Sequence, residues 1–244
     1  MLHQNGFAGE GAEKMTIRLP WASPQGMEKY LRSTELCDSA NEDVKKKALD
    51  LARGTTTQRQ AAVKIFYYVR DGILFALDDL DAKASATLKR GHGSSASKTN
   101  LQVALLRAAG IPARYHRSIV SKRYMEGIVS SLAYKRLPDD LWWHCWCECN
   151  LAGEWISCDS QFDKALYEAL CQKGVVTEEQ IPTIDWDGVN DLETVAFWQV
   201  DCIGAYDCVD AVLKKTQKQV LHPQTIKRVA FWLSNRHIDK LRRG

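Results

Sequence analysis

The sequence lacks the features that mark several large classes of protein. Its 33 lysines and arginines nearly balance 30 acidic residues, and the net charge of +3 is far from the basic excess of nucleic-acid binding proteins. It contains no apolar run of about 18 residues that would span a membrane. Its N-terminus also lacks the charged start and apolar stretch of a signal peptide. We therefore expect a soluble, cytoplasmic protein with neither a nucleic-acid nor a membrane partner.

The eight cysteines lack the spacing of a metal site, since no Cys-x-x-Cys pair and no zinc-type histidine spacing is present. Cys145, Cys147 and Cys149 alternate along an expected strand, which places the three thiols on one face and His144 on the other. Thiols in a row on one strand stand too far apart to close around one ion. We interpret them as small apolar residues between a sheet and a helix, and expect no metal.

The composition is that of an ordinary globular protein, with 45% hydrophobic and 26% charged residues. A length of 244 residues fits a single domain, and we expect residues 1–34 to form an N-terminal arm and 165–244 a helical C-terminal embellishment. Apolar periodicity and turn signals predict helices over 41–54, from Thr57 onward and over 95–109, and strands over 113–120, 141–151 and 154–160. This order of elements indicates an α+β fold.

A glycine-rich loop, "GHGSS", runs directly into the predicted helix 95–109. Ser95 lies at the N-terminal end of this helix, where unpaired N–H groups and the helix dipole favour a developing negative charge. The helix ends at Gly110, and Pro112 prevents its continuation. A serine at this place is either an N-cap or a nucleophile, and its neighbours in the fold decide which.

Two further residues suggest the nucleophile. His144 lies on a predicted strand between tryptophans, and Asp159 ends the next strand of a hairpin that turns at Ala152-Gly153. We expect neighbouring strands to bring the carboxylate close enough to hold the imidazole in one tautomer. A nucleophile on a helix with a histidine and an aspartate on strands is an arrangement for acyl transfer.

Three segments together resemble the transglutaminase-like superfamily: "AAVKIFYYVRDGILF", "ASATLKRGHGSSASKTNLQVALLRAAGIPARYH" and "HCWCEC…GEWISCDSQFD". The resemblance covers about residues 35–165. It implies a papain-related α+β fold in which a nucleophile helix packs on an antiparallel sheet, with His144 and Asp159 as catalytic residues. The family's cysteine falls on Ser95, in a loop pattern Gly-x-Gly-x-Cys-x-x-Lys that is otherwise matched.

The resemblance also implies the chemistry: attack on a peptide, amide or thioester carbonyl, an acyl-enzyme intermediate, and release of the acyl group to water or an amine, without a cofactor. Candidate walls of the substrate pocket are Trp142, Trp143, Trp146 and Trp155, and we expect His92 to border the site. We expect a hydrolase or an acyltransferase, and the alternative is a protein that binds a peptide or partner in the same cleft.

Serine at position 95 leaves three explanations open. It replaces a catalytic cysteine and inactivates an enzyme, it serves as the nucleophile of a natural serine enzyme, or it belongs to a natural pseudoenzyme. A serine hydroxyl does not ionise as a thiol does, so we expect most of the activity to be lost. Elsewhere, "DWDGVND" (185–191) resembles a calcium loop, but it lacks the length and the terminal glutamate, and we interpret it as a turn.

Overall fold

The computed structural model describes residues 19–22, 24–220 and 224–243. The N-terminal half of the expected arm 1–34 therefore lies outside the described residues. The α-helices are α1 Glu42–Ala52, α2 Gln58–Gly72, α3 Ala84–Arg90, α4 Ser95–Ala108, α5 Ser131–Tyr134, α6 Lys164–Gln172, α7 Asp210–Val220 and α8 Gln224–Arg242. Short 3-10 helices are η1 Glu28–Tyr30, η2 Lys122–Met125 and η3 Ala196–Trp198. The strands are β1 Leu74–Phe75, β2 His92–Gly93, β3 Ala113–Ser121, β4 Asp140–Leu151, β5 Glu154–Ser157 and β6 Gln199–Tyr206.

The helix starts follow the capping residues of the sequence. The side chain of Asn41 accepts hydrogen bonds from the first turn of α1, and Thr57 accepts one from the Gln60 N–H at the start of α2. The side-chain amide oxygen of Gln60 in turn accepts from the N–H of Thr56, one residue before the cap. The predicted starts of both helices are confirmed.

Four antiparallel strands form the main sheet in the order β5-β4-β3-β6. The hairpin between β4 and β5 turns at Ala152 and Gly153, which both have positive φ, as a two-residue hairpin requires. The sequence analysis expected a helical segment over 165–244, and strand β6 within it contradicts this. β6 is an edge strand whose ladder with β3 is broken by two register shifts, so it has no clean alternation of apolar and polar residues.

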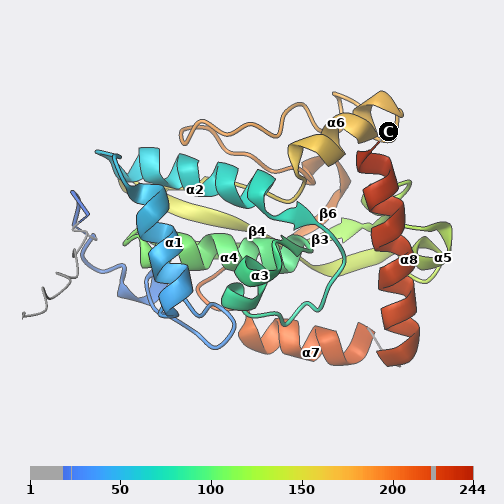
Figure 1. Ribbon diagram of the computed structural model, residues 1–244, viewed down its shortest axis with the longest axis horizontal. Coiled ribbons are helices and arrows are strands. Elements are labelled where there is room, and N and C mark those ends of the chain that lie inside the picture. Colours follow the sequence, from blue (N-terminus) through green and yellow to red (C-terminus); the bar gives the residue numbers. More distant parts are fainter. Residues whose placement is uncertain (1–18, 23, 221–223, 244) are drawn as a thin grey trace, which may run out of the picture.

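Helix α4 lies at the centre of the molecule (Figure 1). It packs on β4 on one side and on α1, α2 and α3 on the other. Cys145, Cys147 and Cys149 are buried in the core cluster that includes Leu101 and Leu105 of α4. The predicted cysteine face of the sheet is therefore confirmed, as is the α+β fold with a helix packed on an antiparallel sheet.

The last helix, α8, returns to the segment that precedes the glycine-rich loop (Figure 1). Arg242 donates to the Phe75 carbonyl and to Asp163, and Asn235 donates to the carbonyl of Leu77, which lies shortly after β1. These contacts place α8 beside the N-terminal end of α4. Within the described part of the chain, no helix combines the length and apolar character needed to cross a membrane.

Candidate active site

The loop before α4 is shaped by its glycines. Gly91 ends α3 in the left-handed conformation, with φ of 70°. A Cβ on Gly93 would lie 2.5 Å from the Oγ of Ser97, so only glycine fits at this position. The loop delivers Ser95 as the first residue of α4, with 8% of its surface exposed. Position 95 thus lies almost closed off from solvent at a helix N-terminus.

A buried carboxylate that the sequence analysis missed holds this loop in place. Asp78 accepts hydrogen bonds from the N–H of Ser94 at 3.0 Å and from the Ser97 hydroxyl at 2.8 and 2.9 Å. Its other partner is Arg90 at 2.5 Å. Burial raises the pKa of Asp78, and the bonds from Ser94 and Ser97 partly offset the rise. The sequence offered no signal for this role, because Asp78 lies in a polar connection far from any motif.

Lys98 of the loop pattern is fully buried. Its ammonium group donates to the carbonyls of Arg70 at 3.0 Å and Ile73 at 2.5 Å, at the end of α2. Burial lowers the pKa of Lys98 to about 7. Lys98 therefore links α4 to the end of α2, and this link is a structural reason for a lysine at this position of the loop pattern.

His144 lies on β4 and is 1% exposed. Neither of its ring nitrogens has a hydrogen-bond partner among the described residues. Burial lowers the pKa of His144 to about 3, so the imidazole is neutral at physiological pH. Its cross-strand neighbour on β3 is Ser118, whose buried hydroxyl is also without a partner.

Tyr124 of η2 connects Ser95 with His144. Its ring meets the imidazole edge to face, with ring centroids 5.7 Å apart. Burial and the charge of Asp159 raise the pKa of Tyr124, and a hydrogen bond with the Ser95 side chain partly offsets this rise. The tyrosine was not singled out in the sequence, since it lies in the polar stretch 121–140, which shows no helical or strand period.

The expected contact between Asp159 and His144 is not made. Strand β5 ends at Ser157, and the Cys158 N–H still donates to the Cys147 carbonyl of β4, but Cys158 also forms a parallel bridge to Leu192 and the Asp159 N–H donates to the Leu192 carbonyl. The carboxylate of Asp159 accepts hydrogen bonds from Thr194, through both its hydroxyl and its N–H, and from the Gln161 N–H at 3.1 Å. Burial raises the pKa of Asp159 to about 6. Asp159 is therefore in the same neighbourhood as Tyr124, with its hydrogen bonds directed to the 192–194 segment.

Beside Ser95 lies a cavity of about 90 Å³. Asp78, Ser94, Ser95 and Tyr124 supply its polar groups. Most of the wall is aliphatic or aromatic and includes Leu77, Leu80, Met125, Val129, Leu137 and Leu141. An apolar cavity with a few polar groups that converge at one point is typical of a ligand site.

Three of the residues predicted to bind substrate, Trp143, Trp146 and His92, lie in different surroundings. Trp143 lines the cavity. Trp146 is buried in the sheet and donates from its indole N–H to Ser157, so it lies behind the site and outside the cavity lining. His92 is exposed on β2, with Nδ1 3.2 Å from the carbonyl of Arg90. The structure thus brings Trp143 to the cavity but not Trp146 or His92.

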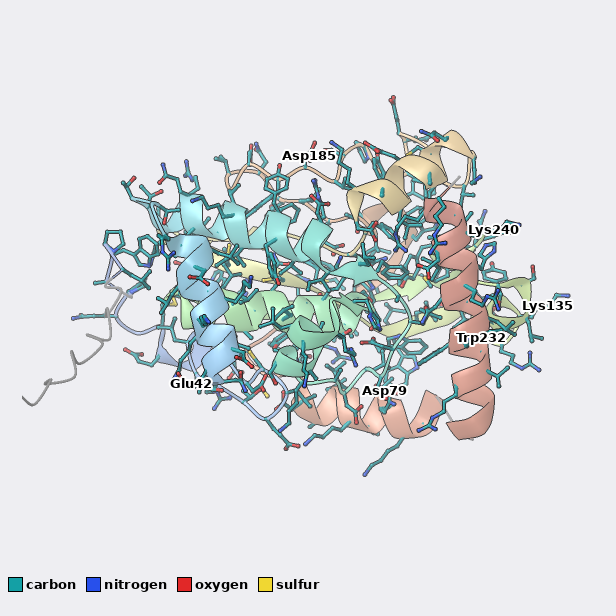
Figure 2. All side chains as sticks on the ribbon, viewed as in Figure 1. Glu42, Asp79, Lys135, Asp185, Trp232 and Lys240 are labelled. Carbon is teal, nitrogen blue, oxygen red and sulfur yellow. The ribbon has the colours of Figure 1, made fainter. Side chains whose placement is uncertain are left out.

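The carboxylates of the segment 185–191 serve as partners within the fold. Asp185 pairs with Arg70, and Figure 2 labels it on the loop beside α2, at the outside of the molecule. Asp187 accepts from the N–H groups of Val189 and Asn190, and Asp191 accepts from the Ser157 N–H. In the described part of the chain, no group of three histidine, cysteine or acidic side chains is arranged to hold a metal ion.

Comparison with known proteins gives a family match for part of the chain and a similar solved structure. Residues 45–160, which include Ser95, His144 and Asp159, match the family model described as the transglutaminase-like superfamily. A crystal structure described as a "Putative Cysteine Protease" from Cytophaga hutchinsonii is similar at 16% identity and a TM-score of 0.48, over 78% of this chain and 50% of that one. The chain thus spans half the length of that protein, and among curated proteins none matches. The segment 45–160, a little under half of the chain, is thus similar to the transglutaminase-like superfamily.

Proposed function

We propose that the cleft at position 95 supports acyl-enzyme chemistry on amides or thioesters that carry a short apolar acyl group. The proposal is based on the position of residue 95. It is the first residue of the buried helix α4, and it lines a mostly apolar cavity within a segment similar to the transglutaminase-like superfamily. The N–H groups of the first helical turn are the donors expected to meet the oxyanion.

In this proposal His144 is the general base. Its neutral imidazole has a free lone pair at physiological pH, and both ring nitrogens are available for a substrate-induced hydrogen bond. The hydroxyl of Tyr124 orients the side chain of residue 95, since it contacts that side chain while its ring contacts His144. Asp159 is assigned a positioning role through the network around Thr194 and Gln161.

Buried polar groups without partners support a functional interpretation of this region. Such groups are costly in a protein core, and their presence calls for an explanation such as a bound ligand. Ser118 and His144 face each other across two strands, and the Gln161 side chain follows Asp159 closely along the chain. All three are buried and lack partners among the described residues.

The size of the cavity suggests the acyl group. An apolar cavity of about 150 Å³ is known to hold benzene, so a cavity of about 90 Å³ favours a short aliphatic chain over an aromatic ring. Each buried methylene contributes about 0.8 kcal/mol to binding. We therefore infer a preference for butanoyl-like or isovaleryl-like groups, including the side chains of small aliphatic amino acids.

The serine hydroxyl needs its proton removed as it attacks, whereas a thiol next to an imidazole reacts as the thiolate. We propose that the Ser95 form binds the acyl group with little turnover and that cysteine at this position gives the active enzyme. Water as acceptor makes the protein a hydrolase, and an amine makes it an acyltransferase, so an assay has to offer both.

The test compares Ser95→Cys/Cys202→Ser with Cys202→Ser alone, because Cys202 is an exposed thiol that would compete for the reagents. Both proteins are incubated with acyl thioesters and acyl amides of graded chain length, with and without methylamine. We expect an acyl adduct on residue 95 by intact mass and peptide mapping, fastest for short aliphatic chains. Adding His144→Asn should slow acylation by about 100-fold or more.

The competing proposal is a binding protein that uses the same cleft without chemistry. It is supported by the hydrogen bonds of Asp159, which go to Thr194 and Gln161 and leave His144 unpaired. If residue 95 as cysteine is neither acylated nor alkylated by iodoacetamide faster than the half-buried thiols of Cys171 and Cys208, the enzyme proposal is wrong. Saturable binding of the same acyl amides without turnover would then favour the binding protein.

A further inference from the structure

A second set of chemically complementary side chains crosses three neighbouring strands of the sheet. Cys202 on β6, His116 on β3 and Glu148 on β4 lie in a row. The His116 Nε2 lies 3.1 Å from the Sγ of Cys202, and its Nδ1 lies 2.8 Å from a carboxylate oxygen of Glu148. We call this set the Cys202 relay. It does not depend on the proposed function of the Ser95 cleft.

The hydrogen bonds determine which nitrogen carries the proton. A carboxylate only accepts, so Glu148 requires the proton of the neutral imidazole to be on Nδ1. The Nε2 lone pair is then left to accept the S–H of Cys202. A thiol bound to a base that is oriented by a third group is the arrangement of an activated nucleophile.

The two supporting side chains are held rigidly. The second oxygen of Glu148 accepts from Arg114 at 2.5 Å, and the guanidinium lies over the ring of Trp155. The ring of His116 stacks flat on that of Trp146, at a centroid distance of 4.5 Å and an angle of 7°. Because Glu148 and Trp146 restrain the imidazole of His116, this base is held at a fixed position beside Cys202.

Cys202 is also the most accessible thiol of the eight. Five cysteines are buried, Cys171 and Cys208 are half-buried, and Cys202 alone is exposed, on the edge strand of the sheet. Disulfide exchange suits such a thiol, since the departing sulfur takes up the charge and no set of oxyanion donors is needed. The Asp201 carboxylate accepts from the Cys202 N–H and adds negative charge beside the thiol.

We propose that Cys202 is a site of reversible modification by small disulfides, with a preference for cationic or neutral ones. The Cys202 proton passes to Nε2 of His116, and the thiolate attacks one sulfur of R–S–S–R. The S–S bond of the reagent breaks as the bond to Cys202 forms. The departing thiolate takes the proton from the imidazolium and leaves as R–SH, so the reagent disulfide is the oxidant and atoms and charge balance.

The experiment measures the rate of mixed-disulfide formation with cystamine at each cysteine by quenched peptide mapping. We expect Cys202 to react at least about tenfold faster than Cys208 and Cys171, and faster with cystamine than with anionic oxidised glutathione. His116→Asn keeps a donor for Glu148 but removes the base, and should slow Cys202 by about tenfold while the other rates stay the same. Cys208→Ser is the matched control and should leave the Cys202 rate unchanged.

Exposure by itself also makes a thiol reactive, so the rate in His116→Asn decides between activation by His116 and simple exposure of Cys202. If that variant is folded by circular dichroism and Cys202 reacts as fast as in the parent, the relay does not activate the thiol and the proposal is wrong. If the variant unfolds, the test is made on the parent protein, in the native state and in denaturant. Its Cys202-to-Cys208 rate ratio should fall to about one in concentrated guanidinium chloride, and a ratio near one already in the native protein also overturns the proposal.

Discussion

The Ser95 cleft and the Cys202 relay are two polar sites joined to the same sheet, and they differ in what holds their histidines. His144 in the cleft is 1% exposed and has no hydrogen-bond partner, whereas both nitrogens of His116 in the relay are paired. The Ser95 cleft, whose histidine has no hydrogen-bond partner, contains the residues predicted from motif spacing. The Cys202 relay, whose histidine has two partners, corresponds to no sequence motif and is built from three strands.

The two sites are also close to each other. Ser118 pairs with His144 on one side and with Cys202 on the other, and the ring of Trp146 contacts both imidazoles. One site faces a cavity and the other the sheet edge. Burial in the cleft excludes water from a reaction at His144, but it also leaves this histidine without the partners that fix the tautomer of His116.

The largest expected effect is the gain of acylation in Ser95→Cys/Cys202→Ser. An ionised thiolate at a helix N-terminus should react about 100-fold or more faster than the serine hydroxyl. Intact mass after incubation with a butanoyl thioester measures this rate. Acylation of residue 95 at the same slow rate in this variant and in Cys202→Ser alone would contradict the prediction.

Gly93→Ala should damage the cleft and spare the relay. The added Cβ meets the Ser97 hydroxyl at 2.5 Å and has to displace the network of Asp78, which we expect to cost about 1–3 kcal/mol of unfolding free energy. Urea unfolding measures the loss. Gly72→Ala is the matched control, since its Cβ meets only the half-buried ring of Tyr68, at 3.1 Å, and should change stability less. Equal losses in the two variants would argue against a tightly packed loop.

Asp159→Asn should change how stability depends on pH. Burial raises the pKa of Asp159 from 3.8 to about 6, so within this window the folded protein holds a proton that the unfolded chain has released, and stability falls as the pH rises. Asparagine does not titrate and removes this effect. The unfolding free energy of the variant should therefore rise by about 1–3 kcal/mol relative to that of the parent as the pH increases from 3.8 to about 6.

Urea unfolding of both proteins across the pH range checks the prediction. The comparison with the variant is needed because the pKa of His144, lowered from 6.5 to about 3, makes stability rise with pH over an overlapping window. A difference between variant and parent that does not change with pH would contradict the assigned burial of Asp159. The cystamine rate at Cys202 should be the same in both proteins.

The smallest expected effect concerns the acyl preference of the cleft. Leu141→Phe fills part of the cavity and should shift the preferred chain in the Ser95→Cys/Cys202→Ser background toward acetyl by a factor of about ten, which corresponds to one or two methylenes. Leu132→Phe, at an exposed position outside the lining, is the control. Acylation rates across the chain-length series report the shift, and an unchanged preference would place the acyl group elsewhere.

Much of the fold follows from short-range signals. The caps at Asn41 and Thr57, the hairpin at Ala152-Gly153 and the alternation of Cys145, Cys147 and Cys149 all agree with the predicted elements. These features depend on a few neighbouring residues and their backbone angles. The edge strand β6 was missed because most of its residues are exposed and its ladder is irregular.

By itself the sequence determined most of the elements, the α+β class, the helix that begins at Ser95 and the strand that carries His144, because local propensity and periodicity act over a few residues. Only the tertiary structure decided which polar groups meet. The pairing of residues 157–159 with Leu192 brings Asp159 to Thr194, and the pairing of β3 with β6 brings Cys202 to His116. Such contacts join residues far apart in the chain, and their partners are selected by strand register and burial, which no local pattern encodes.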